Sequence, residues 1–405
     1  MKQTFSKTWP LFFGLGMMMI ANGLQGTLLG LRASIEDFSV LTTGLIMSSY
    51  YFGFLAGSLQ VPKIISQVGH IRVFAALASV ASTAVLLHAV FVDPVLWFGI
   101  RAITGFSYAG LYLVVESWLN DAATNKTRGK IMGVYMVVTF LGMALGQALL
   151  NVGDPSQVEL FVIVSVLVSL ALVPISLSRR PAPDFTVNET IALITIWKRS
   201  PLGVFGTLLS GLTSAAIFSI GPIYAISIGM STAAISGFMA SFIMGAVIFS
   251  MPVAWISDHM DRRKMIIILG AFSGIVACGL LAVSPSGNIG IFVVMAMLGG
   301  ISMPIYSQCI SHVNDNLLSR QFVAATGTLL MLNGLGAAIG PLLVTGIMQL
   351  LGNHGYAVLL IVSYGAIGVF GFYRTFRNEA IPQEDQSDTI LMPARGSSVQ
   401  IYTDD

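Results

Sequence analysis

Two stretches of the chain, 194 residues apart, carry the same pattern of glycines and polar residues. They are Arg101–Asp121, RAITGFSYAGLYLVVESWLND, and Met295–Asp315, MAMLGGISMPIYSQCISHVND. In register they share Gly105, Tyr112, Ser117, Asn120 and Asp121 with Gly299, Tyr306, Ser311, Asn314 and Asp315. Both stretches are mostly apolar over about 20 residues, the length that a helix needs to cross a bilayer core. The chain therefore contains an internal repeat built on a membrane-spanning segment.

The repeat extends into the neighbouring segments. The same offset pairs Gly133, Gly142 and Gly146 with Gly327, Gly336 and Gly340. An offset of 192 pairs Ser49, Gly53, Ser58 and Val61 with Ser241, Gly245, Ser250 and Val253. A repeat of six helices in the same orientation predicts a pseudo-two-fold axis along the membrane normal, with a site between the halves at mid-depth.

The composition excludes most other protein classes. The 405 residues include only 20 Lys and Arg and 18 Asp and Glu, so 9% are charged, against about 25% in soluble domains. Mean hydropathy is +0.83 and 55% of residues are hydrophobic. The net charge of +2 argues against nucleic-acid binding, and the two cysteines, Cys278 and Cys309, lack metal-ligand spacing. These values are typical of a polytopic α-helical membrane protein.

Twelve apolar segments are long enough to span a bilayer, and a polar linker separates the first six from the last six. They are Pro10–Gly30, Leu41–Gln60, Val73–Phe91, Val95–Leu119, Met132–Asn151, Leu160–Ile175, Leu202–Tyr224, Ala233–Trp255, Met265–Val283, Ile289–Ile310, Phe322–Leu343 and Tyr356–Tyr373. We expect an all-α membrane protein with an N-terminal six-helix bundle (1–175), a cytoplasmic linker (176–200), a C-terminal six-helix bundle (201–376) and a disordered cytoplasmic tail (377–405).

The basic residues predict the orientation. Eighteen of the 20 lie on one side of the expected spans, Arg32 alone lies on the other side, and Arg101 lies within a span. Since basic residues concentrate in cytoplasmic loops, both termini are expected in the cytoplasm, in a multi-pass protein of the cell (inner) membrane.

Several motifs resemble those of the major facilitator superfamily. Asp258–Lys264, DHMDRRK, resembles its acidic-then-basic loop, and Arg101-Ala-Ile-Thr-Gly105 resembles its fourth-helix motif. The first-half loop, Ser66–Arg72, has Ser66 in place of the usual aspartate. The stretches Pro62…Val68-Gly-His-Ile-Arg72 and Glu116–Asn120 resemble the YcaD-like branch. The resemblance implies two pseudo-symmetric six-helix bundles and transport by rocker-switch alternating access.

The fourth span carries the main candidate site. Arg101, Gly105, Tyr108, Tyr112 and Glu116 fall within about 80° of helical arc. An arginine in a span costs at least about 2.5–3.5 kcal/mol, so we interpret Arg101 as an anion-binding or charge-coupling group. The alternative is a structural arginine that binds helix carbonyls. The matching second-half stripe has Met295, Ser302 and Ile310 in place of Arg101, Tyr108 and Glu116, so ionic chemistry belongs to the first half.

Further substrate-binding candidates are polar residues on the helices that line the channel in this superfamily. They are Asn22, Gln25, Tyr135, Thr139, Ser210, Ser214, Ser302, Tyr306 and Asn333. The amides of Asn22, Gln25 and Asn333 are the strongest of these, because an amide in lipid must be hydrogen-bonded, and a plain helix–helix bond is the alternative. Together these groups favour a small amphiphilic organic solute, with an anion as one option.

A second set of charges is expected to control conformation. The resemblance implies that Glu116 joins Arg72 or Arg128 in a cytoplasmic latch; a proton-carrying carboxylate and a plain interfacial acid are the alternatives. In the second half, Asp258, Arg262 and Arg263 are the expected latch, and solvated charges are the alternative. His88 is interpreted as a helix-end histidine rather than a proton relay.

These features predict a secondary transporter, with proton coupling left open. The alternative is a transporter-like sensor or accessory subunit that binds a small molecule without net flux. An enzyme is not expected, because the sequence shows no acid–base pair, no nucleophile with a base and no ATP-binding loop. We expect a monomer in the bilayer that binds no cofactor, no metal and no nucleic acid.

Overall fold

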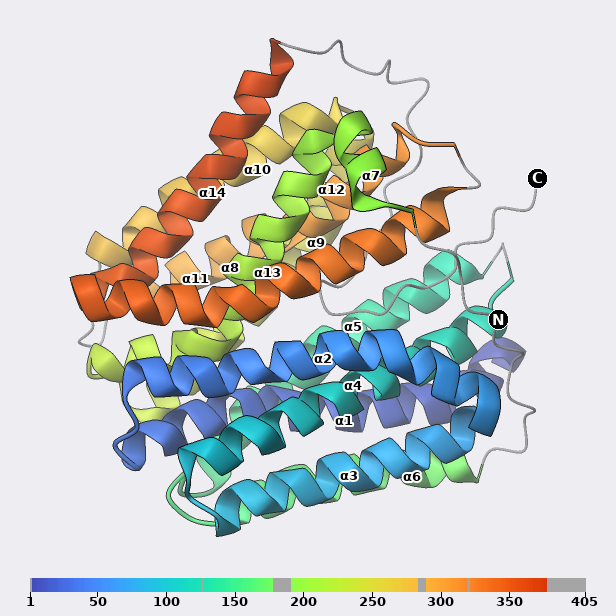
Figure 1. Ribbon diagram of the computed structural model, residues 1–405, viewed down its shortest axis with the longest axis vertical. Helices are drawn as coiled ribbons and strands as arrows, with labels where there is room; N and C mark the ends of the chain where they lie inside the picture. The colour runs from blue at the N-terminus through green and yellow to red at the C-terminus, as the bar shows by residue number, and fades with distance from the viewer. Residues whose placement is uncertain (1, 125–126, 178–190, 283–288, 319–320, 377–405) are drawn as a thin grey trace. The chain divides into compact units, whose positions relative to one another are not determined.

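The computed structural model describes residues 2–124, 127–177, 191–282, 289–318 and 321–376, and these are helical apart from short turns. Two compact units divide the chain (Figure 1). The first contains α1 to α6 and the second contains α7 to α14. The predicted tail, 377–405, and most of the predicted linker fall outside the described residues.

The first unit has six long helices. They are α1 (Lys2–Ile35), α2 (Val40–Val68), α3 (His70–Val90), α4 (Pro94–Asp121), α5 (Arg128–Leu149) and α6 (Glu159–Ser176), with a 3₁₀ turn at Leu150–Val152. Helix α2 packs along α4, α1 packs against α5 and α6, and α3 packs against α4 and α6. Gly69, at φ 91°, ends α2 and allows α3 to begin at the next residue, because glycine adopts positive φ without strain.

The second unit repeats this arrangement. Its helices are α7 (Leu193–Arg199), α8 (Pro201–Ser227), α9 (Thr232–Asp258), α10 (Arg262–Ala282), α11 (Ile289–Ser302), α12 (Pro304–Asn314), α13 (Phe322–Leu351) and α14 (His354–Thr375). Helix α9 packs along α11, α8 along α13 and α10 along α14. These pairs correspond to α2 with α4, α1 with α5 and α3 with α6, so the predicted pseudo-symmetric fold is confirmed.

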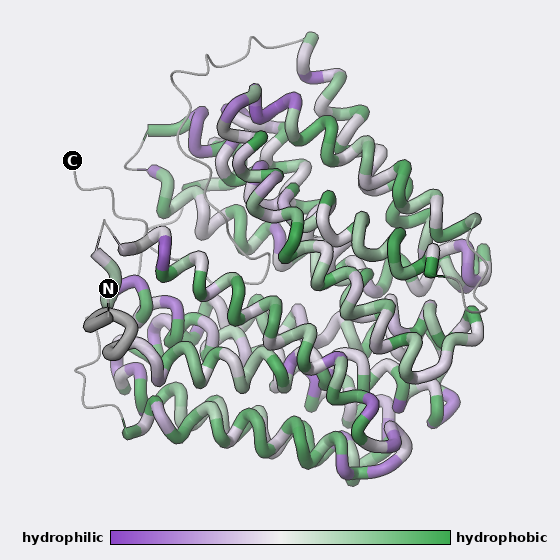
Figure 2. Tube along the Cα trace, turned by 180° about the vertical axis from the view of Figure 1, so that it is seen from behind, coloured by the Kyte–Doolittle hydropathy of each residue, from purple (hydrophilic) through white to green (hydrophobic). Residues whose placement is uncertain are grey.

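Among the described residues, twelve segments are long and apolar enough to cross a membrane. Figure 2 shows hydrophobic residues along the helices and hydrophilic ones mainly near their ends. Large apolar side chains remain exposed on the outer helices, as with Val166, Leu170 and Val173 on α6 and Phe272 and Ile275 on α10. Such surfaces are unfavourable in water and suit a lipid environment.

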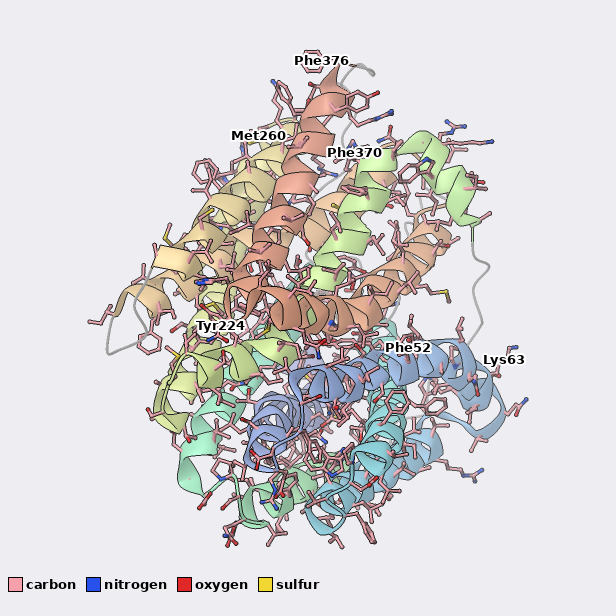
Figure 3. The ribbon with its side chains drawn as sticks, turned by 60° about the vertical axis from the view of Figure 1, so that its left-hand side comes forward. Phe52, Lys63, Tyr224, Met260, Phe370 and Phe376 are labelled. Atoms are coloured by element: carbon pink, nitrogen blue, oxygen red, sulfur yellow. The ribbon has the colours of Figure 1, made fainter. Side chains whose placement is uncertain are left out.

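Two details differ from the predicted spans. The tenth span is interrupted at Met303, where α11 ends and α12 begins, because Pro304 has no backbone N–H to continue the helical hydrogen bonds. In addition, α7 forms within the predicted linker. Its Ile196 is fully buried, and its Trp197 stacks with ring centroids 6.4 Å apart on Phe370 of α14, the residue labelled in Figure 3.

Glycines set the closest helix crossing of the first unit. A Cβ atom added to Gly53 on α2 would lie 1.8 Å from the carbonyl oxygen of Ala102 on α4. A Cβ added to Gly105 on α4 would lie 1.8 Å from the carbonyl oxygen of Tyr50 on α2. The backbone of each helix therefore packs directly against a glycine of the other, and no side chain fits between the two helices.

The second unit contains the same crossing. A Cβ added to Gly245 on α9 would lie 1.9 Å from the carbonyl oxygen of Ala296, and one added to Gly299 on α11 would lie 1.9 Å from that of Phe242. These residues follow those of the first unit by the offsets of 192 and 194 that the sequence predicted. The repeat therefore extends to individual backbone contacts.

Candidate functional site

Arg101 lies inside the first unit, as its position within a predicted span indicated. Its side chain is 4% exposed, and its guanidinium carbon lies 4.4 Å above the ring centroid of Tyr50 from α2. Such a cation–π contact contributes about 2 kcal/mol when both groups are desolvated. Tyr50 was missed by the sequence analysis. Its one signal was its place three residues before Gly53, whose role in the repeat had been recognised.

The predicted stripe of α4 continues as a row of aromatic rings, which we call the aromatic ladder: Tyr50, Tyr108, Tyr112 and Phe54. The ring centroid of Tyr108 lies 6.3 Å from that of Tyr50 and 6.2 Å from that of Tyr112. The Phe54 centroid lies 6.2 Å from that of Tyr112. The aromatic ladder therefore leads from Arg101 along α4, with rings contributed by both α2 and α4.

Helix α1 adds amides to this region. Asn22 Nδ2 donates a hydrogen bond to the Tyr112 hydroxyl at 2.9 Å, and that hydroxyl donates to Met19 Sδ at 3.3 Å. Gln25 is 1% exposed, and neither its amide nitrogen nor its amide oxygen has a partner among the described atoms. The Tyr108 hydroxyl, also buried, likewise has none there. Burying unpaired polar groups is unfavourable, so Gln25 and Tyr108 retain hydrogen-bonding capacity for a ligand.

A further amide on α5 was missed by the sequence analysis. Gln147 Oε1 accepts a 2.8 Å bond from Thr27 Oγ1, and Gln147 Nε2 donates to the Gly23 carbonyl at 2.7 Å. Both of these bonds run to α1, so Gln147 joins α5 to α1.

Glu116 lies in the last turns of α4 and is 2% exposed. The Tyr135 hydroxyl of α5 donates a hydrogen bond to its Oε1 atom. Of the two expected arginine partners, Arg72 lies exposed at the start of α3, and the side chain of Arg128 lies outside the described part of the chain. Tyr135, a predicted substrate contact, is thus a partner of Glu116.

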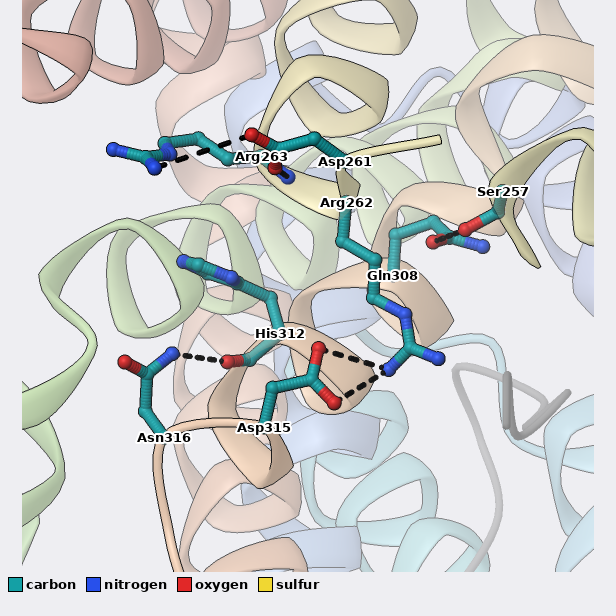
Figure 4. Close-up of polar contacts among 8 residues, drawn as sticks. All are labelled: Ser257, Asp261, Arg262, Arg263, Gln308, His312, Asp315 and Asn316. Atoms are coloured by element: carbon teal, nitrogen blue, oxygen red, sulfur yellow. Dashed lines mark hydrogen bonds and ion pairs between the residues drawn. The ribbon is translucent and has the colours of Figure 1, made fainter. Parts of the chain in front are cut away.

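The second unit contains a buried ion pair at the corresponding end of its helices (Figure 4). Arg262 Nη1, at the start of α10, donates to both carboxylate oxygens of Asp315, at 3.0 and 3.1 Å. Both side chains are 2% exposed. Arg263 Nη2 lies 4.0 Å from Asp261, and the Asp258 side chain falls outside the described residues. The repeat in the sequence includes Asp315 but does not identify it as the partner of Arg262.

A histidine occupies the equivalent place in the first unit. His70, at the start of α3, matches Arg262 by the offset of 192, and its Nε2 lies 3.0 Å from Ser117 Oγ on α4. Because Ser117 donates its own hydroxyl proton to the Val114 carbonyl, His70 Nε2–H is the donor in this bond. The first unit therefore joins the same two helix ends with a hydrogen bond.

The second-unit candidates have packing partners. Asn333 Nδ2 donates to the Thr207 carbonyl and to Ser210 Oγ, both at 3.1 Å, and so joins α13 to α8. Tyr306 lies in a hydrophobic cluster with Ile310 and Leu329. The remaining candidates are buried or half-buried: Thr139, Ser214 and Ser302.

His88 lies at the end of α3 and is fully buried. Its Nδ1 donates to the Ala84 carbonyl at 2.8 Å, and its ring meets Trp97 edge-to-face with centroids 5.4 Å apart. Within the described parts of the chain, no three His, Cys, Asp or Glu side chains cluster as metal ligands would.

Comparison with known proteins identifies the family. The sequence model of the Major Facilitator Superfamily matches residues 11–322 and 203–393. The chain is 27% identical over 344 residues to an uncharacterised MFS-type transporter of Yersinia pestis (strain Pestoides F), covering 84% of this chain and 88% of the relative. It is 23% identical over 380 residues to the uncharacterised MFS-type transporter YcaD of Escherichia fergusonii, covering 92% and 96%.

Solved transporter structures share the fold. The nucleoside transporter NupG superimposes with a TM-score of 0.74 at 14% identity, covering 92% of this chain and 99% of that one. A bacterial homologue of the human lysosomal transporter Spinster, solved inward-facing and unoccupied, gives 0.70 at 14% identity, covering 95% and 98%. These structures show the same fold, and the family model together with the sequence relatives shows that the chain belongs to the major facilitator superfamily, in its YcaD-like branch.

Proposed function

We propose that this membrane transporter is a secondary active carrier that moves a small organic solute across the cell membrane by alternating access. Family membership supports transport itself. The observation that carries the finer proposal is Arg101, a buried guanidinium held over the Tyr50 ring within a membrane-spanning helix. A charge at such a place is costly and marks a substrate or coupling pathway.

The proposed substrate contacts are concentrated in the first unit. Arg101 supplies positive charge, Tyr108 and Tyr112 supply aromatic surface, and Asn22 and Gln25 supply amides. In the second unit we retain Ser214 and Tyr306 as proposed contacts. Ser210 and Asn333 bind each other, which favours the helix–helix role that was the alternative for the amide.

We propose that three contacts at the C-terminal ends of α4 and α12 stabilise one conformation of the carrier. They are the Arg262–Asp315 ion pair, the His70–Ser117 bond and the Glu116–Tyr135 bond. All three join the last turns of α4 or α12 to a neighbouring helix. Proton coupling through Glu116 is the competing role for that carboxylate, since a buried carboxylate is a natural proton carrier.

We propose that the protein is a monomer in the inner membrane. In the proposed orientation, both termini lie in the cytoplasm. The basic residues support it, and Arg32 on the opposite side is compensated by Glu36, 2.7 Å away. A single cysteine placed at Glu36 of a variant that lacks Cys278 and Cys309 tests this orientation. It should react with an impermeant maleimide added outside intact cells, and labelling only after lysis would reverse the topology.

Flux tests the carrier proposal. Purified protein in liposomes should move solute down a gradient, and Arg101→Ala should abolish flux while the variant still inserts and elutes as a single species. Full flux in Arg101→Ala would make Arg101 a structural residue. Binding by the wild type without flux would support the sensor alternative instead.

A further inference from the structure

The two units contain the same helix crossing with different side chains around it. In the first unit, the crossing of α2 and α4 at Gly53 and Gly105 has Arg101, Tyr108 and Tyr50 near it. In the second unit, the equivalent positions are Met295, Ser302 and Phe242. The glycine contacts agree within 0.1 Å between the units. The crossing therefore forms without a guanidinium and without the two phenols, so packing alone does not explain why the first unit has them.

The register of α1 against α4 places further polar groups beside these residues. Consecutive spans alternate in direction, so α1 and α4 are antiparallel, and the Asn22–Tyr112 bond aligns them. Gln25 lies about 4.5 Å from Asn22 along α1, and Tyr108 lies about 6 Å from Tyr112 along α4, both toward the Pro94 end. Gln25 and Tyr108, which lie at one level, are two of the buried side chains with polar atoms that have no partner among the described atoms.

Taking the carrier function proposed above as its basis, we propose that this region of the first unit binds an aromatic monocarboxylate with a neutral polar substituent. The Arg101 guanidinium carbon lies 4.4 Å from the Tyr50 ring centroid, and a carboxylate would bind the guanidinium N–H groups, which have the matching fork geometry. The aromatic ladder offers ring faces for stacking. Gln25 and Tyr108 offer neutral donors and acceptors for the substituent.

The size and charge of the ligand follow from the same groups. Arg101 and Tyr108 are seven residues apart, about 10 Å along α4, which matches a single substituted ring. The aromatic ladder and the amides contribute no second cation, so a dianion would bury one charge without a counter-charge and is disfavoured. Glu116, about 22 Å from Arg101 along the helix, would repel an anion rather than bind it.

Equilibrium binding to the full-length protein in detergent tests the proposal with defined probes. The probe is 4-hydroxybenzoate. Its comparators are 4-hydroxybenzamide, which lacks the charge, 4-hydroxycyclohexanecarboxylate, which lacks the aromatic face, and terephthalate, a dianion. We expect 4-hydroxybenzoate to bind at least about tenfold more tightly than each comparator. Equal binding of the acid and the amide would overturn the role of Arg101, and equal binding of the cyclohexane acid would overturn that of the aromatic ladder.

The repeat supplies substitutions that this fold already accommodates at the equivalent crossing. Arg101→Met introduces the residue found at Met295 and should remove the preference for the acid over the amide. Tyr108→Ser introduces the residue found at Ser302 and should remove the preference for the aromatic acid over the cyclohexane acid. Met295→Leu is the matched control and should change neither preference. Melting temperatures without ligand establish that each variant is folded, and preferences retained in both folded variants would refute the proposal.

Flux separates this proposal from the carrier function. Binding of 4-hydroxybenzoate without flux in proteoliposomes would contradict the carrier and leave the binding site supported. Flux of some other solute by a protein that does not bind 4-hydroxybenzoate would leave the carrier supported and contradict the ligand class.

Discussion

His70 Nε2 and Ser117 Oγ lie 3.0 Å apart and join the start of α3 to the last turns of α4. The second unit joins the same helix ends through Arg262 and Asp315, an ion pair that is 2% exposed on both sides. The two units therefore join equivalent helix ends with different contacts, a hydrogen bond to Ser117 in one and a buried ion pair with Asp315 in the other.

This difference predicts that breaking the ion pair lowers the free energy of unfolding more than breaking the hydrogen bond does. Removing one partner of a buried ion pair leaves an uncompensated charge and costs about 3–5 kcal/mol, whereas an ordinary hydrogen bond contributes about 0.5–1.5 kcal/mol. We expect Asp315→Ala to lower the free energy of unfolding several-fold more than Ser117→Ala, measured by denaturant titration in detergent. The double variant Arg262→Met/Asp315→Leu should recover part of the loss. Equal effects of Asp315→Ala and Ser117→Ala would contradict this account.

The glycine crossings predict a strong position dependence for glycine substitution. Gly53→Ala and Gly245→Ala would each place a methyl group within 2 Å of a carbonyl oxygen, which forces the helices apart. We expect each to cost about 1–3 kcal/mol or more, as overpacking does. Gly133→Ala is the matched control, because its added Cβ would meet no atom within 4 Å. Thermal unfolding followed by gel filtration measures the difference, and a stable Gly53→Ala protein would show that the crossing can relax.

The Glu116–Tyr135 bond predicts a rescue experiment. Tyr135→Phe removes one donor from a buried carboxylate and should lower the free energy of unfolding by about 1–3 kcal/mol. Adding Glu116→Gln to Tyr135→Phe replaces the carboxylate by a neutral amide, so stability should recover in part. Without recovery, the bond would not be the source of the loss.

The same variants separate the two roles proposed for Glu116. If Glu116 carries protons, Glu116→Gln should abolish the response of flux to an imposed pH gradient. If it acts only as a conformational contact, the response should persist. Flux with and without the gradient, in wild type and Glu116→Gln, gives the answer directly.

The bridge of Gln147 to α1 predicts coupled effects of two substitutions. Thr27→Val removes one bond between α1 and α5, and Gln147→Leu removes that bond together with the one to the Gly23 carbonyl. Such bonds between membrane helices contribute about 0.6 kcal/mol on average and up to about 1.7. A double-mutant cycle should therefore give a coupling energy in this range. A coupling of zero would mean that the two side chains act independently.

The sequence predicted the helical repeat well because its signals are periodic and local. Twelve apolar segments follow from length, and the offsets of 192 and 194 locate Gly53, Gly105 and their counterparts without any structure. The broken tenth span was missed although Pro304 was visible, since many membrane helices continue through a proline, as α13 does at Pro341.

The partners within the site were harder to predict. Helical periodicity shows that Arg101 and Tyr112 share a face, but which residue meets that face depends on the rotation of the neighbouring helix. Tyr50 under Arg101 and Tyr135 beside Glu116 are such tertiary contacts. The expectation that Arg72 or Arg128 pairs with Glu116 came from the family resemblance, and Arg72 lies exposed at the start of α3.

The direct backbone contact between α2 and α4 has a mechanical consequence. Gly53 and Gly105 have no side chains that could change rotamer, so the backbones of α2 and α4 contact each other directly at the crossing. We therefore expect α2 and α4 to rotate together about the two glycines. Ser117 lies about 18 Å and Arg101 about 6 Å from Gly105 along α4, on opposite sides of it, so a rotation about the crossing that shifts Ser117 shifts Arg101 by about a third as much in the opposite direction.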